Sequence, residues 1–302
     1  CQKIARFTHP DVQWIFPTPA ESKRSDEELQ RVFALLSRNP YARIRFPGKN
    51  VFIGIDTIRR LKKEAGFHLA EGRRKVFLIS QAEQMRPEAA NALLKLLEEP
   101  PPNLLLILTT ANLHRLLPTV RSRCQILRFS PLPEPQALAV LQRLYPDEPA
   151  GRLQLVLRLS QNNLKRAQDF LEEDLLEYRD LAVDFLRKAV LINRAHELLQ
   201  LLEPIAQARQ REPARAFLWF LLLWFQDVLH LRAHLPQNQH LNNPDLADNL
   251  QRFIQFLPTL DVEQAVWLVE QALQQLEDPR NFTPMLILLE LAIKLNQVLK
   301  KQ

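Results

Sequence analysis

Cysteine and glycine are scarce in this chain of 302 residues. Cys1 and Cys124 are its two cysteines, too few for a disulfide framework, which favours a reducing, cytoplasmic location. Of its five glycines, Gly151 alone follows residue 135, so the later sequence favours helices over a second sheet. The first residues are polar, and they show no apolar segment of the kind that a secretory signal carries.

Long hydrophobic runs are also lacking. The nearest candidate for a membrane span, Ala216 to Leu223, is followed closely by Gln226, Asp227 and His230. We therefore expect no membrane contact. Hydrophobic residues make up 46% of the chain and charged residues 25%, proportions that are typical of a soluble globular protein.

A phosphate-binding loop of the form G-x-x-x-x-G-K-[ST] is missing. Gly48-Lys49-Asn50 is no substitute, because it lacks both the preceding glycine and the following serine or threonine. In such enzymes an acid that holds magnesium follows a buried strand. Ser80 and Gln81 stand there, after the apolar run Lys75–Ile79, and neither can replace a carboxylate. Glu83 lies further on, where we expect it to complement a helix N-terminus. This degenerate Walker B pair predicts that the chain does not hydrolyse ATP alone.

Positive charge is concentrated in the first third of the chain. The net charge is +6, yet residues 181 to 302 carry 12 basic and 13 acidic residues. A basic cluster lies between Arg43 and Lys75, opposed by Asp56, Glu64 and Glu71. It comprises Arg43, Arg45, Lys49, Arg59, Arg60, Lys62, Lys63, Arg73, Arg74 and Lys75. Contact with nucleic acid or an acidic partner is one interpretation, and a solvated helix face is the other.

Residues 1 to 130 predict an α/β domain. Apolar runs indicate strands at Val12–Phe16, Lys75–Ile79 and Leu104–Leu108. Helical spacing occurs over Asp26–Leu36, from Asp56 as a cap to Gly66, and over Glu88–Glu98, while Ser22–Glu28 is expected to be flexible. Two apolar strands separated by a helix predict a parallel sheet that is covered on both faces.

Helices follow a linker marked by Pro131, Pro133 and Pro135. Amphipathic segments at 134–144, 150–159 and 164–171 predict a three-helix domain over residues 131–175. Residues 176–302 predict a helical domain with breaks at Pro204, Pro213, Pro236, Pro244, Pro258, Pro279 and Pro284. Phe217–Trp224 is apolar on all sides, which favours a buried core helix over the alternative of a base-stacking platform.

The run from Asn91 to Gln125 carries the strongest functional signal. It reads as a helix, a stop at Pro100-Pro101-Pro102, a strand, a polar turn and a second helix that ends at Arg123. An arginine fixed at the edge of an α/β domain suits contact with a phosphate on a neighbouring molecule.

Three segments resemble the clamp-loader branch of the AAA+ ATPases: KVFLISQAEQM, NALLKLLEEPPPNLLLILTT and LLPTVRSRCQ. The resemblance is strong over Lys75–Phe129, weaker over Cys1–Asp11 and loose over the helical remainder. It implies a partial AAA+ domain at 1–130, a lid at 131–175 and an oligomerising collar at 176–302. It also implies an N-terminally truncated chain.

The resemblance assigns roles to individual residues. Ser122-Arg123-Cys124 matches the SRC motif, so Arg123 would be a finger that reaches ATP on an adjacent subunit; a surface arginine paired with a local carboxylate is the alternative. Thr109 and Thr110 match the first sensor. Asn163–Ala167 resembles the second sensor, with Lys165 where an arginine is usual.

The opening segment CQKIARFTHPDV resembles the end of the family's four-cysteine zinc module. Cys1 would be its last ligand, provided that three cysteines precede it in a longer protein, because tetrahedral zinc needs four ligands. A role for His9 as a ligand is less favoured than a role in the turn before Pro10. We therefore expect no cofactor in this fragment, with ATP held by a neighbour.

The implied function is loading of a sliding clamp onto primed DNA. The resemblance implies gamma/tau and delta subunits of DNA polymerase III as partners, in an open ring of five subunits. Two alternatives stay open at this point. One is an ATP-hydrolysing motor of the gamma/tau type, and the other is a non-catalytic DNA-binding or scaffold protein on the same fold.

Overall fold

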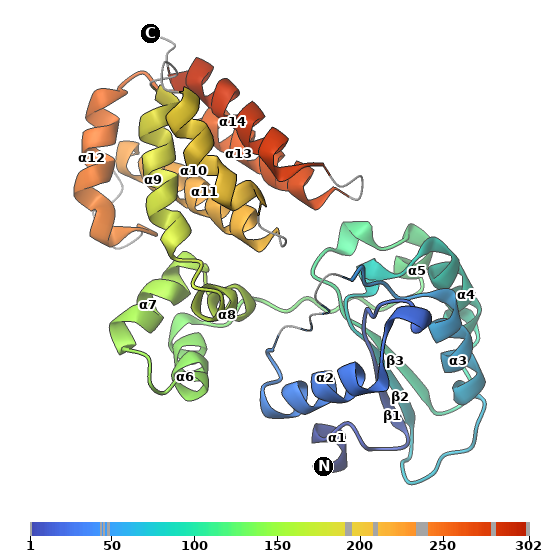
Figure 1. The fold of residues 1–302 in the computed structure, drawn as a ribbon. Coiled ribbons are helices and arrows are strands. Elements are labelled where there is room, and N and C mark those ends of the chain that lie inside the picture. Colours follow the sequence, from blue (N-terminus) through green and yellow to red (C-terminus); the bar gives the residue numbers. More distant parts are fainter. Residues whose placement is uncertain are drawn as a thin grey trace. The chain divides into compact units, whose positions relative to one another are not determined.

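The computed structural model describes residues 2–42, 44, 46, 49–190, 195–207, 211–233, 241–278 and 282–299. The chain forms two compact units, Cys1–Ser130 and Pro131–Gln302, and each is described by itself. The first unit is α/β and the second is helical, which confirms the predicted fold class (Figure 1). Some predictions fall outside the described residues: the zinc ligand Cys1, Arg43 and Arg45 of the basic cluster, and the helix breaks at Pro236 and Pro279.

The described residues of the first unit form three strands and five α-helices. The strands are β1 (Val12–Ile15), β2 (Lys75–Ile79) and β3 (Leu104–Leu108). The α-helices are α1 (Gln2–Ala5), α2 (Asp26–Arg38), α3 (Ile55–Ala65), α4 (Pro87–Glu98) and α5 (Pro118–Arg121). Three short 3₁₀ helices are η1 (Glu21–Lys23), η2 (Ala82–Gln84) and η3 (Leu113–Arg115).

The strands form a parallel sheet in the order β1-β2-β3. Phe77 and Ile79 point to one face, where they pack with Leu93 of α4 in a fully buried core. Helix α2 covers the other face at β1, through contacts of its Phe33 with Phe16 and Phe7.

One face of strand β3 is partly exposed, contrary to the expectation of a sheet that is covered on both faces. Leu104, Leu106 and Leu108 pack onto the α3–α4 core, whereas Leu105 and Ile107 are 38% and 37% exposed. The reason is the alternation of side chains along a strand. The face that carries Leu105 and Ile107 is the one on which α2 packs over β1, and the α2 cluster does not extend to β3.

Two helix starts differ from the sequence predictions. Ser25 caps α2 in a reciprocal arrangement with Glu28, so the segment expected to be flexible is a defined helix entry. At α3 the N-cap is Gly54, and Asp56 lies in the first turn, where it pairs with Arg59 at 3.2 Å. Asp56 thus complements the helix dipole and does not cap the helix.

Asp11 anchors the loop that leads into β2. Its buried carboxylate accepts backbone N–H bonds from Ala70, Glu71 and Gly72 at 2.7 to 2.9 Å. A Cβ at Gly72 would lie 3.2 Å from both Asp11 Oδ2 and the Arg74 carbonyl, so glycine suits this close approach. The three bonds lower the pKa of Asp11 to about 2.

The second unit is built from helices (Figure 1). The first three are α6 (Glu134–Leu144), α7 (Ala150–Leu159) and α8 (Leu164–Glu172). The others are α9 (Glu177–Val190), α10 (Ala195–Gln207), α11 (Glu212–Arg232), η5 (Pro244–Leu246), α12 (Ala247–Phe256), α13 (Val262–Glu277) and α14 (Pro284–Leu299).

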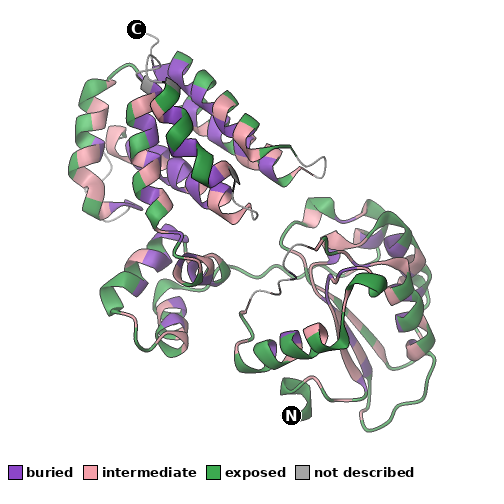
Figure 2. Cartoon of the chain, in the orientation of Figure 1, coloured by how far each residue is buried: buried purple, intermediate pink, exposed green. Residues whose placement is uncertain are grey.

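One continuous apolar core joins the first three helices to the rest of the second unit, and Figure 2 shows buried residues along both. Phe170 of α8 contacts Phe220 of α11 with ring centroids 5.0 Å apart. Trp219 Nε1 donates to the Leu159 carbonyl at 2.8 Å, and the Arg166 guanidinium lies 3.5 Å from the centre of the Trp219 ring. The division of this unit into lid and collar stays a prediction.

Helix α11 is the central helix of this core. It is 21 residues long and apolar enough to cross a membrane by length and composition, contrary to the sequence expectation. However, 67% of its apolar window is buried inside the unit, as in the core helix of a soluble protein. Burial of Phe217 and Trp224, the two ends of the run, supports its predicted core role.

Pro204 corrects a second expectation. The sequence predicted a break there, but Pro204 lies inside α10. A proline removes one backbone hydrogen bond and disturbs the preceding turn. Three residues of α10 follow Pro204, so the disturbed turn lies close to the C-terminal end of the helix.

Asp227 of α11 holds the start of the segment that leads into η5. Its carboxylate, which is fully buried, accepts bonds from the backbone and side-chain nitrogens of Asn242 and Asn243 at 2.7 to 3.0 Å. Asn243 in turn accepts from Arg179 Nε at 2.8 Å. These bonds satisfy a charged group that would otherwise be costly to bury.

Candidate functional site

The carboxyl ends of β2 and β3 bring together four of the predicted site residues: Ser80, Gln81, Thr109 and Thr110. In the register of the sheet Ile79 lies opposite Leu108, so each pair directly follows its strand. The Thr109 N–H donates to the Ile79 carbonyl, and the Thr109 carbonyl accepts from the Ala82 N–H, both at 2.9 Å. In open α/β sheets this edge is the usual location of a site.

Ser80 and Gln81 have structural roles in this turn. Ser80 Oγ accepts a hydrogen bond from Trp14 Nε1, and Gln81 has a left-handed backbone with φ of 51°. Glu83 lies in the first turn of η2. Its Oε2 is buried and has no partner among the residues that the structure describes.

A cavity of about 550 Å³ lies beside the two threonines. Thr109, Thr110 and Cys124 line it together with the apolar side chains of Ile126 and Phe129. Thr110 Oγ1 accepts from the Asn112 N–H at 3.0 Å, so this hydroxyl is already engaged in a local turn. Burial raises the pKa of the Cys124 thiol, which therefore stays protonated at neutral pH.

Arg123 follows the one-turn helix α5. Val120, which is fully buried, anchors this turn, and Pro118 begins it. One edge of the Arg123 guanidinium contacts Glu98, because Nε and Nη2 both lie 2.6 Å from Glu98 Oε1. Nη1 donates to the Thr119 carbonyl at 3.1 Å.

The contacts of Arg123 are compatible with both interpretations of this residue from the sequence. The arginine does pair with a local carboxylate, and its side chain is also 37% exposed. A guanidinium has five N–H donors in a fixed plane. Even with Ser122 Oγ at 3.4 Å from Nη1, the partners of Arg123 among the described residues engage four donors at most. At least one Nη2 donor is left for another acceptor.

Glu98 is the site residue that sequence reasoning missed. It is the last residue of α4, directly before the Glu99-Pro100 stop. The signal was present in the LEEPP block, but only the packing of α5 against α4 shows which of the two glutamates faces Arg123.

Lys165, the predicted second-sensor residue, belongs to the second unit. It lies exposed in the first turn of α8, behind the cap Asn163, whose side chain accepts from the Arg166 N–H at 3.0 Å. Arg166 makes the packed contact with Trp219, and burial lowers its pKa to about 10. The sensor role of Lys165 stays a prediction.

Half of the described residues of the basic cluster have partners within the first unit. Lys49 pairs with Glu28, Arg59 with Asp56, and Arg60 with Glu21. Lys75 is buried and donates to the carbonyls of Glu64 and Phe67, at the end of α3. These contacts favour structural roles over a continuous surface for nucleic acid.

His9 takes part in a turn, as the sequence favoured. Its Nδ1 accepts from the Asp11 N–H at 3.1 Å. Within the described ranges, no group of three or more histidine, cysteine or acidic side chains is placed to hold a metal ion. Cys1, the predicted zinc ligand, lies outside those ranges.

Comparison with known proteins gives a match to a family model and a relative that aligns over nearly the whole chain. Residues 1–133 match the family model described as DNA polymerase III, delta subunit. The chain is 31% identical to DNA polymerase III subunit delta' of Pseudomonas aeruginosa, in an alignment that covers 97% of this chain and 79% of that protein.

Two further matches carry the name of another subunit. Over 32% of this chain and 16% of the other protein, the chain is 36% identical to DNA polymerase III subunit gamma/tau of Mycobacterium bovis. A crystal structure of a gamma subunit-related protein from Thermotoga maritima aligns over 99% of this chain and 89% of that one, with a TM-score of 0.41 and 16% identity. The match to the Pseudomonas protein extends over nearly the whole chain, and on that match the chain belongs to the family of DNA polymerase III delta' subunits.

Proposed function

We propose that this chain supplies Arg123 in trans to ATP bound by a neighbouring gamma/tau subunit within the DNA polymerase III clamp loader. In this proposal the loader is a cytoplasmic ring, which also contains a delta subunit and places a sliding clamp on primed DNA. The chain itself holds no ATP and contributes one charge to the site of its neighbour.

The observation that carries the proposal is the exposed, braced guanidinium at the end of α5. Glu98 fixes one edge and the Thr119 carbonyl a second point, while donor capacity remains on Nη2. A planar cation that is held in this way suits a phosphate oxygen, because part of the cost of ordering the side chain is met before contact.

Ser80 supports the non-hydrolysing part of the proposal. Its hydroxyl is engaged by Trp14, so the strand end offers a hydrogen-bonded neutral group where a magnesium ligand would be needed. The neighbouring Gln81 is likewise uncharged. An ATP-hydrolysing role of the gamma/tau type would require a carboxylate at this place.

The test is ATP turnover by a loader assembled from this chain and its partner subunits. We expect Arg123→Ala to lower turnover at the affected site by about 100-fold or more, because a preorganised charge that acts on the transition state is lost. Arg123→Lys should recover little, since a lysine lacks the planar fork. Single-turnover hydrolysis isolates that site from the others.

Arg115→Ala is the matched control, because Arg115 is an exposed arginine in η3 of the same unit. Both variants must co-elute with the partner subunits in gel filtration. If the loader that contains Arg123→Ala hydrolyses ATP as fast as the loader that contains Arg115→Ala, the finger role is wrong. A DNA-binding or scaffold role then gains support. If the isolated chain turns over ATP, the motor role replaces the proposal.

A further inference from the structure

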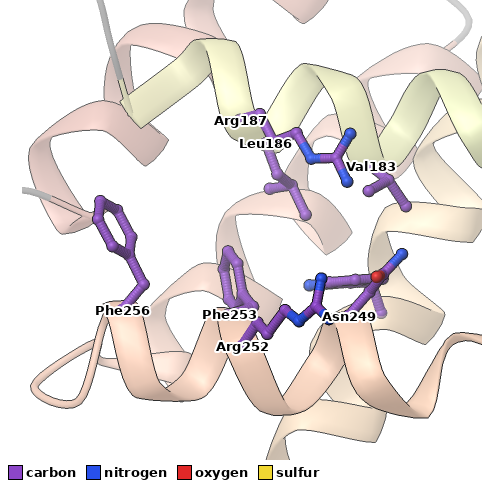
Figure 3. A pocket seen from close by; sticks show the side chains of 8 residues that line it. Val183, Leu186, Arg187, Asn249, Arg252, Phe253 and Phe256 are labelled. Carbon is purple, nitrogen blue, oxygen red and sulfur yellow. The ribbon is translucent and has the colours of Figure 1, made fainter.

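A groove in the second unit lies between helices α9 and α12, with α11 as its floor. Its volume is about 360 Å³, within the range of sites that hold a small group or a few side chains. Figure 3 shows side chains of the two helices facing each other across the opening. The lining residues are Val183, Leu186, Arg187, Trp224, Asn249, Arg252, Phe253 and Phe256.

The walls of the groove are apolar and partly uncovered. Val183 and Leu186 of α9 face Phe253 and Phe256 of α12 (Figure 3). Phe253 also meets Trp224 edge to face, with ring centroids 5.7 Å apart. Phe256 is 69% exposed, so an aromatic ring stands open at the rim. Exposed aromatic rings beside a groove are frequent anchors for a partner.

The polar groups of the groove are mainly donors. Trp224 is only 4% exposed, yet its Nε1–H has no acceptor in the part of the chain that the structure describes. This nitrogen is itself buried, so the donors within reach of an occupant are those of Arg187, Arg252 and Asn249. Arg252 makes no hydrogen bond or ion pair with any described residue, and Arg187 pairs only with Asp184, at 2.9 Å.

Among the described residues no carboxylate lines the groove, and its Arg252 has no ionic partner, so positive charge remains available to an occupant. A complementary occupant therefore carries acceptors and negative charge, together with a bulky apolar group for the walls. We propose that the groove binds an acidic peptide segment of a partner protein, with a large apolar side chain between α9 and α12 and carboxylates toward Arg187 and Arg252.

A peptide suits this groove because both walls are helices with apolar stripes and charged rims. A chain that lies along them can alternate an inward apolar side chain with outward carboxylates, as in known modes of groove recognition. The inference does not depend on Arg123, which lies in the first unit.

A random-peptide phage library provides a test that assumes no sequence. The library is selected on the whole immobilised chain and counter-selected on a variant that combines Arg252→Glu with Phe256→Ala. We expect enrichment of peptides that place leucine, isoleucine, phenylalanine or tryptophan next to aspartate or glutamate. Failure to enrich any groove-dependent peptide, or enrichment of basic peptides, would overturn the proposal.

Fluorescence anisotropy with an enriched, labelled peptide then measures affinity. We expect Arg252→Glu and Phe256→Ala each to raise Kd by about tenfold or more, with Arg187→Gln weaker in effect. The controls are Arg143→Glu, an exposed arginine of α6, and Trp267→Ala, a 54% exposed aromatic of α13. Neither control should change Kd, and equal losses in both sets would contradict a groove site.

Two further measurements keep the outcomes distinct. Circular dichroism must show that each variant keeps the thermal unfolding midpoint of the parent. If Arg252→Glu fails to fold, the milder Arg187→Gln replaces it in the affinity measurement. Sedimentation tests the other occupant. If the parent chain self-associates and Phe256→Ala abolishes that association, the groove holds a second copy of this chain and the proposal is wrong.

Discussion

At the scale of single residues, Glu98 emerges as a brace for the proposed finger. One of its oxygens accepts from both Nε and Nη2 of Arg123, which restricts rotation of the guanidinium. The pair is partly exposed, so its contribution is small, at about 1 kcal/mol or less. A small energetic contribution can still matter for rate when it fixes the direction of a charge.

Replacing Glu98 by glutamine should therefore lower ATP turnover of the assembled loader by up to about fivefold, since ~1 kcal/mol corresponds to about that factor in rate. Steady-state kinetics should show the change mainly in kcat. Glu99→Gln is the control, because Glu99 is the exposed neighbour of Glu98.

A double-mutant cycle separates bracing from a general structural effect. If Glu98 acts through Arg123, its replacement should have no further effect in the Arg123→Ala background. Additive losses would show that Glu98 acts elsewhere. A turnover defect that is equal for Glu98→Gln and Glu99→Gln would likewise exclude the brace.

Asp11 gives a pH-dependent prediction. Its folded pKa of about 2 lies below the ordinary value of 3.8, so its carboxylate stabilises the fold above about pH 4. That stabilisation is lost as the pH falls through about 2. The difference in unfolding free energy between the parent and Asp11→Asn should therefore shrink between pH 4 and pH 2.

Trp14 fluorescence can monitor this change, because Trp14 is the single tryptophan of residues 1–130. Replacement of the three later tryptophans by phenylalanine removes the signal of the second unit. A difference that stays constant from pH 6 to pH 2 would mean that the bonds to the loop of residues 70–72 do not depend on ionisation of Asp11.

At the scale of elements, Asp227 fixes the start of the segment before η5. The carboxylate satisfies four donors of Asn242 and Asn243, and burial raises its pKa despite these bonds. Asp227→Ala would leave the donors buried without an acceptor. We expect a loss of about 3 kcal/mol in the unfolding free energy of the second unit, measured by urea denaturation.

Asp248→Ala provides the comparison, since Asp248 is an exposed acid in the first turn of α12. It should change stability by less than about 0.5 kcal/mol. Equal effects of the two substitutions would show that the bonds of Asp227 contribute little.

The sequence predicted the ends of a helix well where a proline lies directly beside that end. Helices α6 and α7 have the expected bounds because Pro133 and Pro149 directly precede them. The prediction at Pro204 was wrong because tertiary packing can hold a helix across a proline near its end. The incomplete cover of β3 was missed because cover depends on how far α2 reaches over the sheet.

The site was predictable only in part, for the same reason. The SRC motif identified Arg123, but its partner Glu98 is 25 residues earlier in the chain. The α9–α12 groove has no sequence signal at all, because Leu186 and Phe253 are distant in sequence and meet only in the folded unit. Contacts between elements that are far apart require the three-dimensional structure.

At the scale of the whole molecule, the predicted lid and collar share one core. Phe170 and Trp219 connect the two parts through ring packing and a hydrogen bond to Leu159. Removal of residues 131–175 would expose Phe220, which is now 2% exposed. Uncovering such a side chain costs about 1.5 to 3 kcal/mol, before other losses.

We therefore expect a fragment of residues 176–302 to unfold at a clearly lower urea concentration than a fragment of residues 131–302. The larger fragment should unfold in a single transition at all wavelengths. Tryptophan fluorescence and circular dichroism together provide the measurement. Equal midpoints for the two fragments would mean that lid and collar are energetically independent.

The uncovered part of β3 has a consequence for how the chain behaves in concentrated solution. Within the described residues β3 pairs on one edge alone, and Leu105 and Ile107 add exposed apolar surface to the strand. A free strand edge of this kind can template pairing with the same strand of another molecule. We therefore expect Ile107→Lys, a single change in this five-residue strand, to slow aggregation of the chain on storage.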